Sequence, residues 1–259
     1  MSCLPSHGRV KCVRCFEPAQ ATDFDITRRG APDATWRITS NPLAWGSVEP
    51  EIVVLGFSKG PTQAGALAGS PHDAIAYKGS RAAVGKIFAH IGIVPEPKDG
   101  RYREMVDRLI ADQDGRLHFG SLVRCTVERY DEDGRAWKGS GGGMLDKFMA
   151  TPFGHEVASN CASQFLGALP VRTKLVVMFG LGSKLNYISA TRKLVEAARP
   201  GKWRTVNEVA YSDGSVTFVH VEHFASQGAL LPNWLGANAH PRSEYGRKAR
   251  DAVQTALIG

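Results

Sequence analysis

Two short apolar runs constrain the fold of this chain most strongly. They lie within Glu51–Gly56 and Lys174–Phe179, are rich in β-branched residues, and end at or just before a glycine. Strands that are apolar on both faces are typical of a sheet covered by helices on both sides. The two runs therefore predict buried strands of an α/β protein.

Segments with helical apolar spacing alternate with further predicted strands. Helices are predicted at Arg81–His90, Met105–Ala111, Glu156–Leu169, Leu185–Ala198 and Ser243–Leu257; further strands are predicted at Leu117–Cys125 and in a hairpin of Thr205–Tyr211 and Ser215–Glu222. This alternation predicts a three-layer α/β/α sandwich with a central, mainly parallel sheet. Such a sheet binds ligands at the carboxyl ends of its strands.

The length of the chain is compatible with one large domain or two small ones. Of its 259 residues, 43% are hydrophobic, which is enough for a sizeable core. We expect one domain over 1–259, with residues 1–49 as an irregular arm, because this stretch has neither helical nor strand periodicity. The segment Gly139–Gly143 is predicted as a surface loop, since it lacks the context of a phosphate-binding loop.

The charge of the chain points to an anionic partner. The formal net charge is +7, which suits nucleic acid, a membrane surface or a merely soluble basic protein. No run approaches the roughly 18 apolar residues of a membrane span, and no secretion signal is visible. We therefore expect a cytoplasmic protein that does not enter a membrane.

The cysteines indicate a metal site rather than disulfides in such a reducing compartment. Cys12 and Cys15 are spaced to reach one metal, Cys125 ends a predicted strand, and Cys161 lies in the first turns of a predicted helix. Four thiolates suit an iron–sulfur cluster or zinc. The alternative is that Cys125 and Cys161 are small core residues. Cys3 is left over.

The order of these motifs resembles the iron–sulfur uracil-DNA glycosylases. The resemblance rests on Cys12-x-x-Cys15, Pro50–Gly56, Ser121-Leu-Val-Arg-Cys125, Asn160-Cys161 and Lys174–Gly182, and it spans nearly the whole chain. It implies a 4Fe-4S cluster on the four cysteines, with zinc as the alternative. It also implies a monomer that acts on DNA containing uracil or another damaged base.

The first catalytic motif of that family departs from its usual pattern here. Gly56-Phe57-Ser58-Lys59-Gly60 keeps the glycines, but Phe57 or Ser58 stands where an acid or an amide is expected. A serine hydroxyl can hydrogen-bond a water but is a poor base. Gln63 offers an amide nearby. One alternative is therefore a weak or inactive member that only binds DNA or a damaged base, and another is a zinc-stabilised protein acting on nucleotides.

The second catalytic motif of the family is a histidine after a late strand. His223 follows the second predicted hairpin strand, and the resemblance implies that it donates a hydrogen bond to the base as the glycosidic bond breaks. His240-Pro241 is a competing match, but it precedes the last predicted helix instead of ending a strand.

The remaining site residues are assigned to the base and to the DNA backbone. The resemblance implies that Tyr77 stacks on a flipped base. The base-binding set is Gly56, Phe57, Gly60, Tyr77 and Ser121. Basic residues on the last helix, namely Arg242, Arg247 and Lys248, are candidates for phosphate contacts.

Overall fold

The computed structural model describes residues 4–16, 22–139, 144–226 and 228–258. Among these residues the main sheet has eight strands in the order β1-β4-β6-β5-β9-β12-β11-β10. Its centre is parallel and consists of β6 (Leu117–Ser121), β5 (Ile52–Gly56), β9 (Leu175–Phe179) and β12 (Thr217–Val221). The flanking strands are antiparallel: β1 (Gly8–Arg9), β4 (Leu43–Gly46), β11 (Ala210–Ser212) and β10 (Arg204–Asn207).

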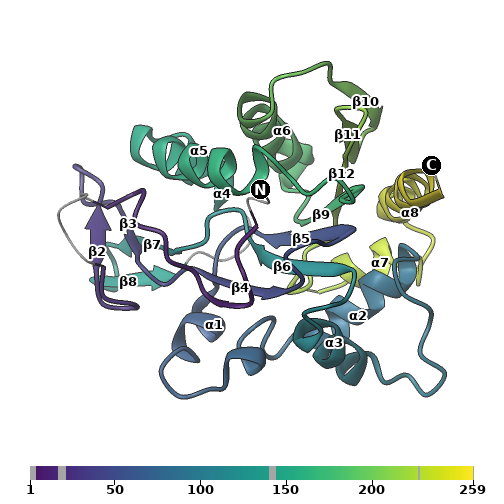
Figure 1. Cartoon of the computed structure of the whole chain (residues 1–259), viewed down its shortest axis with the longest axis horizontal. Coiled ribbons are helices and arrows are strands. Elements are labelled where there is room, and N and C mark those ends of the chain that lie inside the picture. Colours follow the sequence, from purple (N-terminus) through teal and green to yellow (C-terminus); the bar gives the residue numbers. More distant parts are fainter. Residues whose placement is uncertain (1–3, 17–21, 140–143, 227, 259) are drawn as a thin grey trace.

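Helices cover both faces of this sheet, so the predicted three-layer α/β/α sandwich is confirmed (Figure 1). One layer contains α4 (Leu145–Met149), α5 (Pro152–Leu166) and α6 (Asn186–Ala198). The other contains α2 (Arg81–His90), α3 (Tyr102–Ala111), α7 (Leu230–Trp234) and α8 (Arg242–Ile258). The short elements are α1 (Pro61–Gly65) and the 3-10 turns η1 (His72–Ala74) and η2 (Ser183–Leu185).

The two apolar runs form the buried centre of the sheet, as predicted. All five residues of β5 and all five of β9 are buried, and Val54 lies beside Val177 in the parallel register. Burying a side chain of this size contributes about 1.5–3 kcal/mol. The apolar pattern therefore accounts for the burial of these strands in the core.

The prediction of an irregular arm over residues 1–49 was wrong. This stretch contributes β1 and β4 to the main sheet, and β2 (Arg28–Gly30) and β3 (Trp36–Thr39) to a second sheet. The second sheet has the order β2-β3-β7-β8, where β7 is Thr126–Asp131 and β8 is Ala136–Gly139. Strands of two to four residues show no readable alternation, so pairing with distant partners decides them.

Several predicted element boundaries also moved. The strand predicted to reach Cys125 ends at Ser121, and the helix predicted from Glu156 begins at Pro152. Thr151 caps that helix by accepting a hydrogen bond from the Gly154 N–H at 3.0 Å. Cys161 therefore lies in the middle of α5 rather than in its first turns. Cys3 and residues 140–143 of the predicted glycine-rich loop lie outside the described residues.

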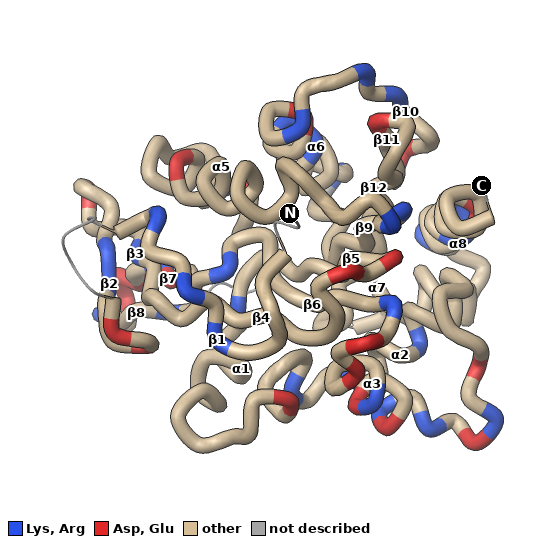
Figure 2. Tube along the Cα trace, in the orientation of Figure 1, with Lys and Arg blue, Asp and Glu red and all other residues tan. Residues whose placement is uncertain are grey.

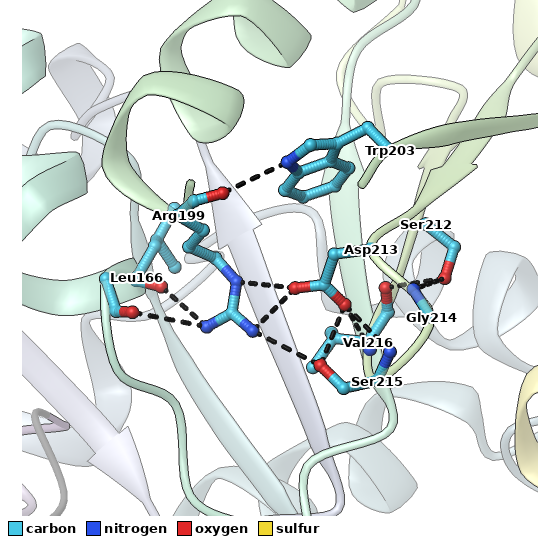
Figure 3. Close-up of polar contacts among 9 residues, drawn as sticks. Leu166, Arg199, Trp203, Ser212, Asp213, Gly214, Ser215 and Val216 are labelled. Atoms are coloured by element: carbon cyan, nitrogen blue, oxygen red, sulfur yellow. Dashed lines mark hydrogen bonds and ion pairs between the residues drawn. The ribbon is translucent and has the colours of Figure 1, made fainter. Parts of the chain in front are cut away.

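The predicted hairpin turn is confirmed between β11 and β12, but the first predicted strand, Thr205–Tyr211, divides into the antiparallel strands β10 and β11. The turn is held by a network at the end of α6 (Figure 3). The carboxylate of Asp213 accepts hydrogen bonds from the N–H groups of Ser215 and Val216 and from the Arg199 guanidinium at 2.7 Å. Arg199 also donates to the carbonyl of Leu166 at 3.0 Å. Burial raises the pKa of Asp213, but these hydrogen bonds lower it overall.

No helix within the described ranges combines the length and apolar character needed to cross a membrane.

Candidate active site

The carboxyl ends of the parallel strands bring several predicted site residues to one edge. Gly56 and Ser121 end β5 and β6 and are direct partners in the register. His223 follows Val221, which pairs with Phe179 at the end of β9. Ligands bind at this edge in open α/β sheets. The edge is therefore the candidate active site.

The loop Gly56–Gly60 is tied to the segment that follows β6. The Leu122 N–H donates to the Gly56 carbonyl at 2.8 Å, and the Val123 N–H donates to the Phe57 carbonyl at 2.9 Å. The Lys59 ammonium donates to the Arg124 carbonyl. These bonds hold the loop in register with the residues that lead into Cys125.

The loop itself presents little to a base. Phe57 is 5% exposed and packs near Phe148, with 6.0 Å between ring centroids. The interpretation of Phe57 as a base-contacting residue is therefore corrected to a packing role. Ser58 is half-buried, and Gly60 precedes Pro61 as the N-cap of α1. Ser58 is therefore the residue of this loop whose hydroxyl can orient a water.

His223 is held in one protonation form. Its Nδ1 accepts a hydrogen bond from the Ala225 N–H at 3.1 Å, and its ring stacks on Phe224 with 4.4 Å between centroids. Burial lowers the pKa of His223, while the Glu222 carboxylate opposes this. A neutral ring whose Nδ1 accepts must carry its proton on Nε2. His223 is therefore a hydrogen-bond donor through Nε2.

Glu222 anchors the turn that carries this histidine. The carboxylate is 3% exposed and accepts hydrogen bonds from the His223 N–H at 3.0 Å and from the Ser226 hydroxyl at 2.7 Å. It also forms an ion pair with Arg242. Arg242, predicted to contact DNA phosphate, is thus engaged by a buried carboxylate and positions the turn after β12.

Tyr77 lies below the edge rather than on it. The ring is 5% exposed and contacts Phe179 and Phe224 edge-on, at 5.6 and 5.2 Å between centroids. Burial raises the pKa of its hydroxyl, which has no hydrogen-bond partner among the described residues. The backbone φ of 52° is in the left-handed region, which costs about 1 kcal/mol or more. The interpretation of Tyr77 as an open stacking platform is therefore corrected: its ring supports Phe224 and hence His223.

Three of the four predicted ligand cysteines, Cys15, Cys125 and Cys161, are buried, and Cys12 is partly exposed. Cys15 and Cys161 share a hydrogen bond, which lowers the pKa of Cys15 to about 7. Burial raises the pKa of Cys125 to about 12, and the charges of Cys15 and Cys12 raise it further. The hydrogen bond with Cys15 and then burial raise the pKa of Cys161, and the charge of Cys125 raises it further. Three distant segments thus bring their thiols within electrostatic reach of one another.

Two buried cations accompany these thiols. Lys59 and Arg124 are each 2% exposed. Burial lowers the pKa of Lys59 to about 8, whereas Cys125 and Cys161 raise it. The Arg124 guanidinium donates to the Leu43 carbonyl and lies over the Phe165 ring, and Gly120 leaves room for it, because a Cβ there would lie 2.3 Å from Nη1. Thiolates near these basic side chains would offset part of the cost of burying them, so the cysteine set is compatible with a metal group.

The distances between the cysteine sulfurs can be compared with those of a zinc site. Within the described ranges, no three of the four cysteine sulfurs lie within 4.8 Å of one another. A tetrahedral zinc site with Zn–S bonds of about 2.3 Å would place its sulfurs about 3.8 Å apart. The spacing is thus wider than a single zinc ion requires.

The basic residues of α8 are largely paired within the protein. Arg247 forms an ion pair with Glu244, and Lys248 with Glu208 at 2.6 Å. Acidic and basic residues are interspersed along the chain as a whole (Figure 2). The predicted phosphate contacts from this helix would therefore have to displace existing ion pairs.

A groove between α4, α5 and α6 carries different cations. Its volume is about 510 Å³, and its lining includes His155, Lys184 and Lys193. All three side chains are exposed, and none is within 4.0 Å of a carboxylate in the part of the chain that the structure describes. Lys184 and Leu185 have left-handed φ angles of 52° and 60°. These strained residues turn the chain from the end of β9 into α6.

A cluster near β4 was not predicted from the sequence. His7, His72 and Asp73 place their ligand-type atoms within 4.8 Å of one another. The Gly46 N–H donates to Nδ1 of His7, and Nε2 of the same ring lies 2.9 Å from the Asp73 carboxylate. These two contacts fasten the N-terminal segment to the residues around β4.

Comparison with known proteins does not add to this picture. No family model matches the chain, and no curated protein matches it either.

Sequence reasoning missed Lys59, Arg124 and Glu222. Lys59 stands inside the loop that the family resemblance had already singled out, but a lysine in a polar loop ordinarily indicates solvent exposure. Glu222 directly precedes His223, which was the available signal for it. The burial that gives these three residues their roles is visible only in the folded protein.

Proposed function

We propose that this protein is a DNA glycosylase that hydrolyses the N-glycosidic bond of uracil or another damaged base in DNA. The observation that carries the proposal is the state of His223: a neutral ring, fixed by Ala225 and Phe224, whose Nε2–H donates to no acceptor among the residues that the structure describes. A donor of this kind at the carboxyl edge of a parallel sheet suits a base carbonyl.

The chemistry follows from charge development. As the bond between C1′ and the base breaks, its electron pair moves to the base, and the sugar becomes oxocarbenium-like. The Nε2–H of His223 stabilises the developing negative charge on the base carbonyl. A water then adds to C1′ and loses a proton to solvent, which leaves an abasic site. Ser58 can orient that water, but it is a weak base.

We also propose that Cys12, Cys15, Cys125 and Cys161 hold a 4Fe-4S cluster with a structural role. The convergence of the thiols beside the buried cations Lys59 and Arg124 supports thiolate ligands. When bound, the cluster supplies cross-links between three segments of the chain. Cysteines that bind a metal instead of forming disulfides fit a cytoplasmic location.

DNA backbone contacts belong to the same proposal. The groove cations Lys184 and Lys193 lack ion pairs among the described residues, whereas Arg247 and Lys248 already have acidic partners. Phosphate neutralisation by free cations releases counterions without breaking intramolecular pairs. Lys184 and Lys193 are therefore the better candidates for phosphate contacts.

A second candidate function is that of a binding protein that holds DNA or a damaged base without hydrolysis. It is favoured by the loop Gly56–Gly60, which contains no carboxylate or amide, and by the packing role of Phe57. The two candidates share the site and differ only in whether water is activated.

Single-turnover assays distinguish them. The protein is mixed in excess with labelled oligonucleotides that contain uracil, hypoxanthine or xanthine, and released base is read as strand breaks after alkali. Base release that depends on His223 supports the glycosylase. Binding of the same oligonucleotides without release from any of them overturns the glycosylase in favour of the binding protein. Neither binding nor release overturns both.

A further inference from the structure

The second sheet has one packed face. The sheet lies at one end of the molecule and has the strand order β2-β3-β7-β8 (Figure 1). Trp36, Ile38 and Val127 share a face and are buried, and the Trp36 ring lies 5.2 Å from the ring of Phe148 in α4. Successive side chains of a strand point to opposite faces, so the neighbours of these residues lie on the other face.

The other face carries two aromatic rings in contact. Tyr130 of β7 and Trp137 of β8 are direct partners in the antiparallel register, and their rings meet edge to face with 5.4 Å between centroids. Tyr130 is 36% exposed, and Trp137 is half-buried. Paired rings with exposed surface offer a stacking site to a planar ligand.

Two arginines lie on the same face as these rings. The Arg37 guanidinium lies 4.3 Å from the centroid of the Trp137 ring and donates to the Glu128 carboxylate at 2.7 and 2.9 Å, which fixes its plane. Arg28 lies opposite Thr39 in the register and is exposed. No carboxylate within the described ranges lies within 4.0 Å of the Arg28 guanidinium.

The charge across this face is uneven. Glu132 and Asp133, in the turn between β7 and β8, are exposed and repel phosphate. Arg28 lies on β2, the opposite edge strand of the sheet. A nucleic acid strand on this face is therefore favoured with its phosphates toward β2 and its bases toward β7 and β8.

We propose that this face binds single-stranded DNA, with unpaired bases stacked on Tyr130, Trp137 and the guanidinium of Arg37. We call it the stacking face and define it by Arg28, Arg37, Tyr130 and Trp137. Aromatic rings and arginine planes bind unpaired bases of any sequence, whereas the bases of a duplex are already stacked on one another. The choice of DNA rests on the proposed function, and the preference for unpaired bases rests on the rings.

The stacking face adjoins the candidate active site. Gly139, the last residue of β8, approaches Pro61 so closely that a Cβ on Gly139 would lie 3.0 Å from the proline ring. Pro61 begins α1 and directly follows the loop Gly56–Gly60. The end of β8 therefore lies beside the residues that follow this loop, and a DNA strand bound at the candidate site can continue onto the stacking face.

The test measures the affinity of undamaged, labelled DNA of about 16 nucleotides, as a single strand and as the matching duplex. Loss of one base stack typically lowers affinity by about 5- to 150-fold, so Trp137→Ala should weaken single-strand binding by at least about 5-fold. Tyr130→Ala should act in the same direction. Trp137→Phe should stay nearer the wild type, because a phenyl ring still stacks. Duplex binding should change less in all three variants.

The matched control is Val206→Ala, which removes a 38% exposed apolar side chain from β10. Denaturant unfolding of each variant separates lost binding from lost folding, and the exposed Tyr130 provides the variant that disturbs packing least. Arg28→Ala should reduce the slope of log affinity against log salt by up to about 1.

Several outcomes would overturn the inference. These are a wild type that does not bind the undamaged single strand, unchanged single-strand affinity in both alanine variants, and an equal loss for single strand and duplex. A change of oligomeric state in Trp137→Ala with unchanged DNA binding would also overturn it, because the face would then be a contact between copies of the chain. Single-strand binding that depends on Trp137, without release of any damaged base, leaves the inference standing and overturns the glycosylase alone.

Discussion

Replacing His223 by alanine should abolish most base release. The substitution removes the Nε2–H donor while leaving Glu222 and Arg242 to hold the turn after β12. The ring is fixed by the Ala225 N–H and by Phe224 before any substrate binds, so the donor requires no reorganisation during the reaction. A preorganised donor of this kind is worth about 2.7–4 kcal/mol, or roughly 100- to 1,000-fold in rate.

The pH dependence should have a defined direction. Burial lowers the pKa of His223 below its ordinary value of about 6.5, so the ring is neutral at pH 7. Base release should therefore be constant from about pH 6.5 upward as far as this residue is concerned. The rate of base release should fall only when pH drops through the lowered pKa of His223. A protonated Nδ1 can no longer accept the hydrogen bond from the Ala225 N–H that orients the ring.

The assay is single-turnover release of uracil, hypoxanthine or xanthine from a labelled oligonucleotide across this pH range. His240→Ala is the matched control, since that ring lies exposed before α8. Ser58→Ala should reduce the rate less than His223→Ala, because it affects only the orientation of water. Equal rates in the wild type and His223→Ala would refute the role assigned to the histidine.

Three further predictions concern the metal, the DNA and the fold. Cys125→Ser should lower both iron content and the free energy of unfolding, measured by elemental analysis and denaturant titration; unchanged iron would exclude this cysteine as a ligand. Each phosphate contact that is lost should reduce the slope of log affinity against log salt by up to about 1. Replacing Lys184 and Lys193 together by alanine should therefore reduce this slope for an oligonucleotide by about 2, and Arg247→Ala should change it less. Asp213→Ala should destabilise the fold by about 2 kcal/mol, as expected for hydrogen bonds to a charged group. Since the pKa of Asp213 is lowered, this stabilisation is complete above about pH 4 and is lost as pH falls further, so the wild type and the variant should converge in stability in acid.

The sequence by itself determined the centre of the sheet and the helices around it. The apolar runs of β5 and β9, the helix α2 and the hairpin turn at Asp213 follow from local patterns, because each depends on residues that are neighbours in the chain. The position of the candidate site at the carboxyl edge of the sheet also followed from the sequence. Parallel strands end together and carry Gly56, Ser121 and His223 to one side.

The tertiary structure decided what depends on distant partners. Residues 1–49 form strands because β3 pairs with β7 and β4 with β6, and such short strands have no pattern of their own. Tyr77 was predicted to stack on a flipped base and Arg242 to contact phosphate, but in the structure Tyr77 packs against Phe179 and Arg242 pairs with Glu222. Lys59 shows the same limit most clearly. Its charge predicts exposure, but the folded chain leaves it 2% exposed with its ammonium donating to the Arg124 carbonyl, because the cost of burying a charge depends on groups that the sequence leaves far apart.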